Sequence, residues 1–155
     1  MNHDDAVLEQ RENEQRELTN QLRLQTRLVA EISQIESGIN GEIDQFSEKI
    51  TELLGTRLKL DRVSVWLYND DQLMMECVDL YKRKDRTHTK NLAMNRHDHP
   101  FTFEFLINSR YMIVDQDSME SQAIDYLNTY MKPLGGTSLL VCSSLYNGKA
   151  IGSIV

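Results

Sequence analysis

The amino-acid sequence predicts an α+β domain, an antiparallel sheet with helices packed on it, preceded by a long N-terminal helix. Three observations support this fold class. Residues 5–37 contain no Gly or Pro and repeat their apolar residues at helical spacing. After Asp61 the apolar residues alternate with period two, as in strands. Hairpin signals occur near both ends of the strand-rich part, which favours antiparallel strands with helices on one sheet.

The N-terminal segment is rich in Glu, Gln, Arg and Leu, which are good helix formers. Polar residues surround its narrow apolar stripe, so we expect a homodimer in which the same helix of a second chain covers the stripe. Gln25 and Glu36 interrupt the seam, which favours a short or imperfect coiled coil. The alternative is a helix lying on the domain's own sheet, and both can hold for different turns. The stripe consists of Leu18, Leu22, Leu28, Val29, Ile32, Ile35 and Ile39.

Gly38, Asn40 and Gly41 are expected to break this helix, with Gly38 as its C-terminal cap and Asn40 capping the next helix. The spacing predicts a second helix over residues 41–55. We therefore divide the chain into residues 1–37, a coiled-coil helix, and residues 38–155, a folded domain whose first helix could begin near residue 28. The buried face predicted for the second helix is Ile43, Phe46, Ile50 and Leu53.

A strand is predicted from Arg62 to Tyr68, with alternating residues on its two faces and both faces covered. Asn69–Gln72 has turn composition, and Leu73–Tyr81 returns as the second strand of an antiparallel hairpin. Residues 82–98 are polar and irregular. A loop of that length is typically functional or mobile.

A short helix is expected after residue 98, capped by Asp98, with Pro100 in its first turn and Phe101, Phe105 and Leu106 on its apolar side. Tyr111–Val114 is predicted to be a short strand. Asp117–Glu120 resembles a capping box that opens a further helix carrying Ile124, Leu127 and Met131.

A second hairpin is predicted in the C-terminal part, with strands from Ser138 to Tyr146 and from Lys149 to Val155. Asn147-Gly148 between these apolar runs is the strongest local signal in the chain. Since such a domain would normally continue, we expect it to be truncated in its last strand.

Composition argues against several classes of protein. Hydrophobic residues make up 40% and charged residues 26% of the chain, which is typical of a globular protein. No run approaches the ~20 apolar residues of a membrane span. Met1–Gln10 is acidic and lacks the apolar core of a secretory signal, so we expect a cytoplasmic protein without membrane contact by this segment.

Charge is unevenly distributed. Of the net −7, residues 1–50 contribute most, with 11 acidic and 5 basic side chains, whereas the remainder holds 13 and 12. The sequence therefore lacks the basic footprint of a nucleic-acid partner. The basic residues between Lys82 and Lys90 are expected to form a solvated loop, with an anion-binding edge as the alternative.

Residues that could carry chemistry are few. Cys77 and Cys142 fit neither a zinc ribbon nor a CxxC pair, and their apolar surroundings predict buried free thiols. The spacing of His88, His97 and His99 allows a metal site, but without a fourth ligand we predict solvated histidines and no metal or other cofactor. No Ser-His-Asp arrangement, phosphate loop or carboxylate pair points to an enzyme.

Three segments resemble the GAF domain. They are DRVSVWLYNDD (61–71) with LMMECVDLY (73–81), the stretch from His88 to Ser109, and PLGGTSLLVCSSLYNGKAIGSIV (133–155). The resemblance covers roughly residues 30–155, and the order and spacing of the three segments carry it. The sequence departs from the family at Ser143, where Pro is usual, and at Cys142, which is often aliphatic.

The resemblance is to GAF modules of bacterial sensor histidine kinases and diguanylate cyclases. It implies a non-catalytic sensory domain with a ligand cavity on one face of the sheet. Flanking helices would dimerise and pass the signal to an output domain in the parent chain. The alternative is a GAF-fold dimerisation module with a filled cavity and no ligand.

Ligands known for the family receive little support. The Asn-Lys-Phe-Asp-Glu pattern of cyclic-nucleotide binders is not present, and residues 82–110 contain no Cys for bilin attachment. Methionine sulfoxide reduction would need loop cysteines, whereas both cysteines fall in predicted strands. Small-molecule pockets combine an apolar lining with a few polar groups. On that basis the candidate ligand-binding residues are Trp66, Cys77, Asp79, Tyr81, His88, Phe101, Phe105, Asp115, Tyr126, Tyr130, Ser138 and Cys142. For the tyrosines, the alternative is that they are half-buried packing residues.

Overall fold

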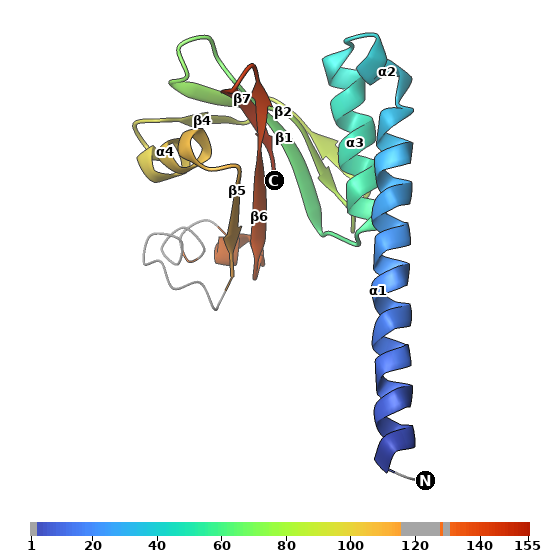
Figure 1. The fold of residues 1–155 in the computed structure, drawn as a ribbon. Coiled ribbons are helices and arrows are strands. Elements are labelled where there is room, and N and C mark those ends of the chain that lie inside the picture. Colours follow the sequence, from blue (N-terminus) through green and yellow to red (C-terminus); the bar gives the residue numbers. More distant parts are fainter. Residues whose placement is uncertain (1–2, 116–127, 129–130) are drawn as a thin grey trace. The chain divides into compact units, whose positions relative to one another are not determined.

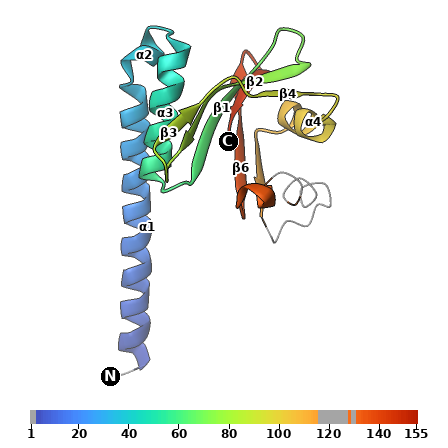
Figure 2. The ribbon, with the colours of Figure 1, turned by 180° about the vertical axis from the view of Figure 1, so that it is seen from behind.

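The computed structural model describes residues 3–115, 128 and 131–155. Its contacts divide the chain into two compact units, Met1–Glu42 and Ile43–Val155. Figures 1 and 2 show the ribbon from opposite sides. The predicted long helix, antiparallel sheet and packed helices are all present, so the predicted α+β class is confirmed. No described helix is both long enough and apolar enough to cross a membrane.

The first unit consists of the long helix α1 (His3–Ser33) and the short helix α2 (Glu36–Ile39). The predicted break at Gly38 is wrong, because α1 ends earlier and Gly38 lies inside α2. The amides of Gln34 and Ile35 bond to carbonyls three residues back, which tightens the last turn and ends the helix. Asn40 is the C-cap of α2 rather than the N-cap of the next helix.

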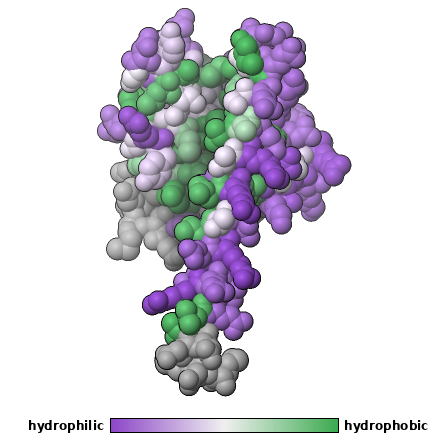
Figure 3. Space-filling model, turned by 45° about the vertical axis from the view of Figure 1, so that its right-hand side comes forward, coloured by the Kyte–Doolittle hydropathy of each residue, from purple (hydrophilic) through white to green (hydrophobic). Residues whose placement is uncertain are grey.

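The surface of α1 is mostly hydrophilic in its N-terminal half, where Figure 3 shows a small hydrophobic group near the end of the helix. The predicted apolar stripe is not uniform. Leu28 is 6% exposed, whereas Leu18, Leu22 and Val29 are 67%, 62% and 68% exposed. The exposed residues therefore form a seam separate from Leu28.

The second unit is built on one antiparallel sheet with strand order β3-β2-β1-β7-β6-β5, to which β4 adds by pairing with β2. Helix α3 (Ile43–Arg57) packs on β1 and β2, and helix α4 (Pro100–Asn108) contacts β5, β6 and β7. The strands are β1 (Arg62–Tyr68), β2 (Met74–Lys82), β3 (Thr87–Thr89), β4 (Ala93–Asn95), β5 (Tyr111–Val114), β6 (Leu139–Tyr146) and β7 (Lys149–Ile154).

The two hairpins form as predicted. β1 pairs with β2, and β6 pairs with β7 through Asn147-Gly148. Both turn residues have positive φ, 50° and 79°, as the tight hairpin turn with right-handed strand twist requires. β7 then returns to pair with β1, which places the two hairpins side by side in one sheet.

The prediction of an irregular loop over residues 82–98 is wrong. β3 and β4 lie in this segment and both pair antiparallel with β2. Each is three residues long and largely polar, so its pairing is set by the open edge of β2 and not by an apolar pattern of its own. The predicted cap of α4 is also wrong: His99 occupies the N-cap position, and the Asp98 side chain accepts a hydrogen bond from Asn95.

The buried face of α3 differs from the predicted one. Ser47, Ile50, Thr51 and Gly55 are buried, whereas Ile43 is 45% exposed. Small side chains at 47, 51 and 55 let the helix approach the sheet closely. A Cβ at Gly55 would lie 2.8 Å from Tyr81 Cδ1, so no larger residue fits without displacement.

The helix predicted after Asp117, including its capping box, Ile124 and Leu127, lies outside the described residues. After it, a short 3-10 helix, Lys132–Leu134, precedes β6.

Candidate ligand-binding site

An irregularity in β2 separates the predicted site residues onto two faces of the sheet. Val65 pairs with Asp79, and Trp66 pairs with Cys77, so Val78 is an extra residue of a β-bulge. Residues paired across antiparallel strands share a face. Asp79 and Tyr81 therefore face α3, together with Val65, whereas Cys77 shares the opposite face with Trp66.

We call these faces the α3 side and the α4 side. On the α4 side, the N-terminal half of α4 lies over the β1–β2 hairpin: the rings of Tyr68 and Phe103 meet edge to face with centroids 5.6 Å apart. Nearer its C-terminus, α4 is tied to β6. The Ser143 hydroxyl lies 2.8 Å from the carbonyl oxygen of Leu106 and 2.9 Å from that of Ser109.

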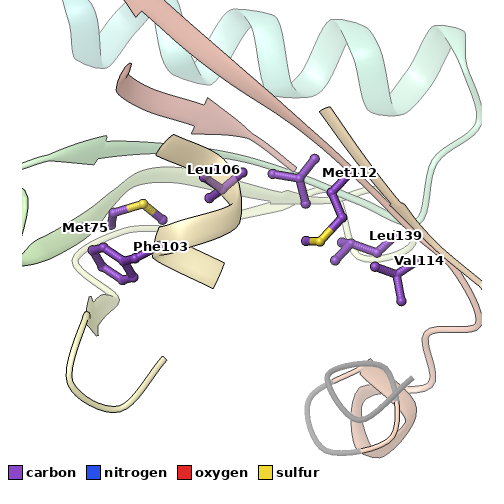
Figure 4. Close-up of a cluster of buried hydrophobic side chains, with 7 residues drawn as sticks. Met75, Phe103, Leu106, Met112, Val114 and Leu139 are labelled. Atoms are coloured by element: carbon purple, nitrogen blue, oxygen red, sulfur yellow. The ribbon is translucent and has the colours of Figure 1, made fainter. Parts of the chain in front are cut away.

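The α4 side holds the main apolar cluster of the domain, drawn in Figure 4. Phe103 and Val114 are fully buried in it. Trp66, Phe101 and Phe105 are half-buried against it, and the last two rings are 5.8 Å apart. The buried members are Met75, Phe103, Leu106, Met112, Val114, Leu139 and Val141. The aromatic and Met side chains of this cluster form an apolar lining that can adapt its packing.

Two hydroxyls on the α4 side are buried and have no hydrogen-bond partner among the described residues: Tyr68 Oη and Ser153 Oγ. Burial raises the pKa of the Tyr68 phenol, and the positive charge of Arg96 partly opposes that shift. The indole of Trp66, by contrast, donates to Ser64 Oγ at 2.9 Å. Sequence reasoning did not select Tyr68 as a ligand contact, because its half-buried position next to a turn gives no distinctive pattern.

The α3 side holds a polar cluster around Asp79, whose side chain is fully buried. Thr51 Oγ1 donates a hydrogen bond to Asp79 Oδ2. His88 Nδ1 lies 3.0 Å and 2.9 Å from the two carboxylate oxygens, so its N–H also donates to them. The ring of Tyr81 lies 5.0 Å from that of His88. Three of the predicted site residues are thus brought together, away from Trp66 and the phenylalanines.

The two cysteines are free thiols on different faces. Cys77 is 1% exposed, and burial, followed by the charge of Asp79, raises the pKa of its thiol to about 11. Cys142 is exposed, so the prediction that both thiols are buried is wrong for it. Cys142 pairs with Ile154, which pairs with Val65, and so it lies on the α3 side.

The other candidates lie at the ends of strands or outside the described residues. Ser138 is exposed just before β6, and Asp115 follows β5. Tyr126 and Tyr130 lie outside the described residues. Among the side chains that the structure describes, no three His, Cys, Asp or Glu groups converge as a metal site would require. The His97 side chain is 96% exposed and lies next to Asp98.

Comparisons with solved structures identify the fold. The phycoerythrobilin-bound GAF domain of a cyanobacterial phytochrome is similar over 86% of this chain and 78% of its own, with a TM-score of 0.60 and 18% identity. The nlh2 GAF domain of A. aeolicus in an inactive state is similar over 84% and 78%, with a TM-score of 0.59 and 12% identity.

Residues 122–287 of a methyl-accepting chemotaxis protein are similar over 85% of this chain and 80% of theirs, with a TM-score of 0.54 and 14% identity. Comparisons with protein-family models and with curated proteins give no match. The chain therefore has the GAF fold, as its sequence resemblance predicted, and its structural neighbours come from sensory proteins.

Proposed function

We propose that this chain is a non-catalytic sensory module of a bacterial signalling protein, and that it binds a small molecule on the α4 side of its sheet. The observation that carries the proposal is the Tyr68 hydroxyl, which lies against the apolar cluster and has no hydrogen-bond partner among the described residues. Small-molecule sites combine an apolar lining with a few polar groups that orient the ligand. A buried hydroxyl without a partner costs ~1–3 kcal/mol, which a ligand oxygen or nitrogen would recover.

The ligand we propose is mainly apolar and carries a hydrogen-bonding group for Tyr68. Trp66, Phe101 and Phe105 would contact its apolar part, since they are half-buried at the same cluster. The phytochrome neighbour is a bilin-bound GAF domain, but a covalently attached bilin is not proposed for this chain because residues 82–110 contain no Cys.

Thermal unfolding with a panel of apolar and aromatic acids, amides and haem tests this proposal. A ligand at 100 times its dissociation constant adds ~2.7 kcal/mol, or roughly 5–10 °C in Tm for this size. Tyr68→Phe should weaken such a ligand roughly 5- to 160-fold, the equivalent of the ~1–3 kcal/mol recovered at the hydroxyl, while leaving the unliganded protein equally stable or more stable.

Tyr146→Phe is the matched control, because Tyr146 is 67% exposed at the end of β6. It should change neither ligand affinity nor stability. A ligand that stabilises the wild type and Tyr68→Phe equally would remove the assignment of the site to the α4 side.

A second candidate function, an interaction module without a ligand, is favoured by a different observation. Tyr111, Ile113 and Leu140 are 62%, 58% and 53% exposed on the α3 side of β5 and β6. The α1 seam of Leu18, Leu22 and Val29 is also exposed. These surfaces suit a partner, and we propose a second copy of the chain, paired through α1.

Sedimentation equilibrium of the wild type and Leu22→Glu tests the pairing. A charge in the middle of the seam should convert a dimer to a monomer, whereas Arg23→Glu, next to the seam, should not. A wild-type chain that is monomeric at high concentration would contradict the proposed pairing. A dimer in which no panel compound alters unfolding would favour the interaction module over the sensor.

A further inference from the structure

The segment from Thr87 to Asn95 runs antiparallel along the whole of β2, and we call it the strap. Its β3 part pairs with Leu80–Lys82, and its β4 part pairs with Met74–Glu76. Between these, the amide of Cys77 donates to the carbonyl of Leu92 at 2.8 Å, and the amide of Asn91 donates to that of Cys77 at 3.0 Å. The strap is therefore hydrogen-bonded on both sides of the bulge at Val78.

The two parts of the strap place side chains on opposite faces of the sheet. His88 is paired with Tyr81, on the α3 side, and its imidazole reaches Asp79. Met94 is paired with Met75, on the α4 side, and packs against the apolar cluster. Both residues belong to one short segment, so a single stretch of backbone carries side chains that contact the two faces of the sheet.

The α3 side of the strap is anchored through a buried carboxylate. Asp79 is fully buried and receives hydrogen bonds from Thr51 of α3 and from His88 of the strap, so it joins the two elements. Losing one donor would leave a buried charge incompletely satisfied, which is far costlier than losing a surface contact. Lys90 Nζ adds a second link, 2.7 Å from Glu48 Oε1 of α3. That hydrogen bond raises the pKa of Lys90 and lowers the pKa of Glu48.

We propose that the strap is a coupling element that transmits changes in the α4-side cluster to helix α3, with His88, Asp79 and Thr51 as its anchor. The role we assign to this coupling rests on the proposed sensory function, because a ligand on the α4 side would act through Met94. Coupling itself is a property of the unliganded protein and is tested without any ligand.

Amide hydrogen exchange of α3, measured relative to that of β1, is the test. Met94→Ala removes contacts on the α4 side and should raise the exchange rate of the α3 amides roughly fivefold or more, the lower range of typical coupling between sites. In an Asp79→Asn/His88→Ala background, which we call the detached background, the effect of Met94→Ala on the α3 rates should be strongly reduced, because only the Lys90–Glu48 ion pair still joins the strap to α3. The double substitution avoids an orphaned carboxylate, so the background folds.

Val114→Ala is the matched control. Val114 is fully buried in the same cluster but lies on β5, outside the strap. Val114→Ala should change the amide exchange rates of α3 and of β1 by the same factor. Equal acceleration of α3 by Val114→Ala and Met94→Ala, or an undiminished Met94→Ala effect in the detached background, would overturn the proposal. A null ligand screen would leave the exchange result standing, so failure of the strap and failure of the sensory function are distinguishable.

Discussion

Gly55→Ala tests whether the close approach of α3 to the sheet is what positions the anchor. Two effects of opposite sign compete. Replacing Gly by Ala inside a helix stabilises it by ~1 kcal/mol. The new Cβ, however, would lie 2.8 Å from Tyr81 Cδ1 and 3.1 Å from Tyr81 Cε1. Tyr81 is 3% exposed and its ring lies against His88, so it has little room to move away.

Overpacking of this kind typically costs ~1–3 kcal/mol. With two ring atoms this close, and Val63 Cγ2 in contact at 3.6 Å, we expect the upper half of that range. The net result should be a loss of about 1–2 kcal/mol, equivalent to roughly 2–8 °C in Tm. Urea unfolding followed by circular dichroism and by Trp66 fluorescence measures it. Thr56→Ala, on the exposed side of α3, should stabilise by a few tenths of a kcal/mol.

A double-mutant cycle identifies the clash. Tyr81→Leu in the Gly55→Ala background should recover part of the loss, giving a coupling energy of ~0.5–3 kcal/mol between the two positions. If Gly55→Ala stabilises the protein as Thr56→Ala does, α3 is not held against the sheet at this distance, and the anchor geometry loses its support.

Four further predictions concern the Asp79 cluster, the two cysteines and helix α4. His88→Ala alone should destabilise the domain by ~2–3 kcal/mol, which is less than for a fully buried pair because the His88 side chain is 30% exposed. Adding Asp79→Asn should recover much of this loss. Equal losses in the single and double variants would contradict a buried charged anchor. Cys142 should react with a thiol reagent in the native protein, and Cys77 only on unfolding. Since the pKa of Cys77 is raised to about 11 in the folded state, its contribution to stability is complete below pH 9 and falls as the pH rises towards 11, a decline that a Cys77→Ala variant should lack. Ser143→Ala removes the hydroxyl that contacts the carbonyl of Leu106 in α4 and that of Ser109 just after it, and should cost ~1 kcal/mol with faster exchange confined to α4; unchanged α4 exchange would contradict this role.

Elements set by local chemistry could be predicted from the sequence. β1 has its predicted ends, because alternating apolar residues and a polar turn define a strand without reference to distant residues. The Asn147-Gly148 turn is similarly local. β3 and β4 could not be predicted, since they are short and polar and exist because β2 offers an unpaired edge.

The buried face of α3 shows a different limit. Apolar spacing selects Ile43 and Phe46, but the helix turns a row of small residues to the sheet, at Ser47, Thr51 and Gly55. The four-residue spacing of these side chains was the available signal. This spacing identifies a close contact between helix and sheet only if the hydrogen bond from Thr51 to the buried Asp79 is also known. That hydrogen bond joins residues 28 positions apart in the chain.

The candidate site residues were selected by type, as polar groups in an apolar lining, and a regular period of two would put Cys77, Asp79 and Tyr81 on one face of the sheet. The bulge at Val78 reverses the alternation, and this single extra residue separates the apolar cluster from the buried carboxylate. Because Val78 is the extra residue, deleting it would make Cys77 and Asp79 neighbours in the chain, and regular alternation would still place them on opposite faces while β1 and β2 pair without a break. Deleting Leu80, which is paired with Ser64, would instead move Tyr81 to the α4 side, and the misplaced side chains should cost several kcal/mol out of the ~5–15 kcal/mol that a domain has. We expect cooperative unfolding in urea to survive deletion of Val78 and to be lost on deletion of Leu80, whereas Val78→Ala should lose ~1 kcal/mol. A Val78 deletion as damaging as the Leu80 deletion would mean that Val78 is not the residue that separates the two clusters.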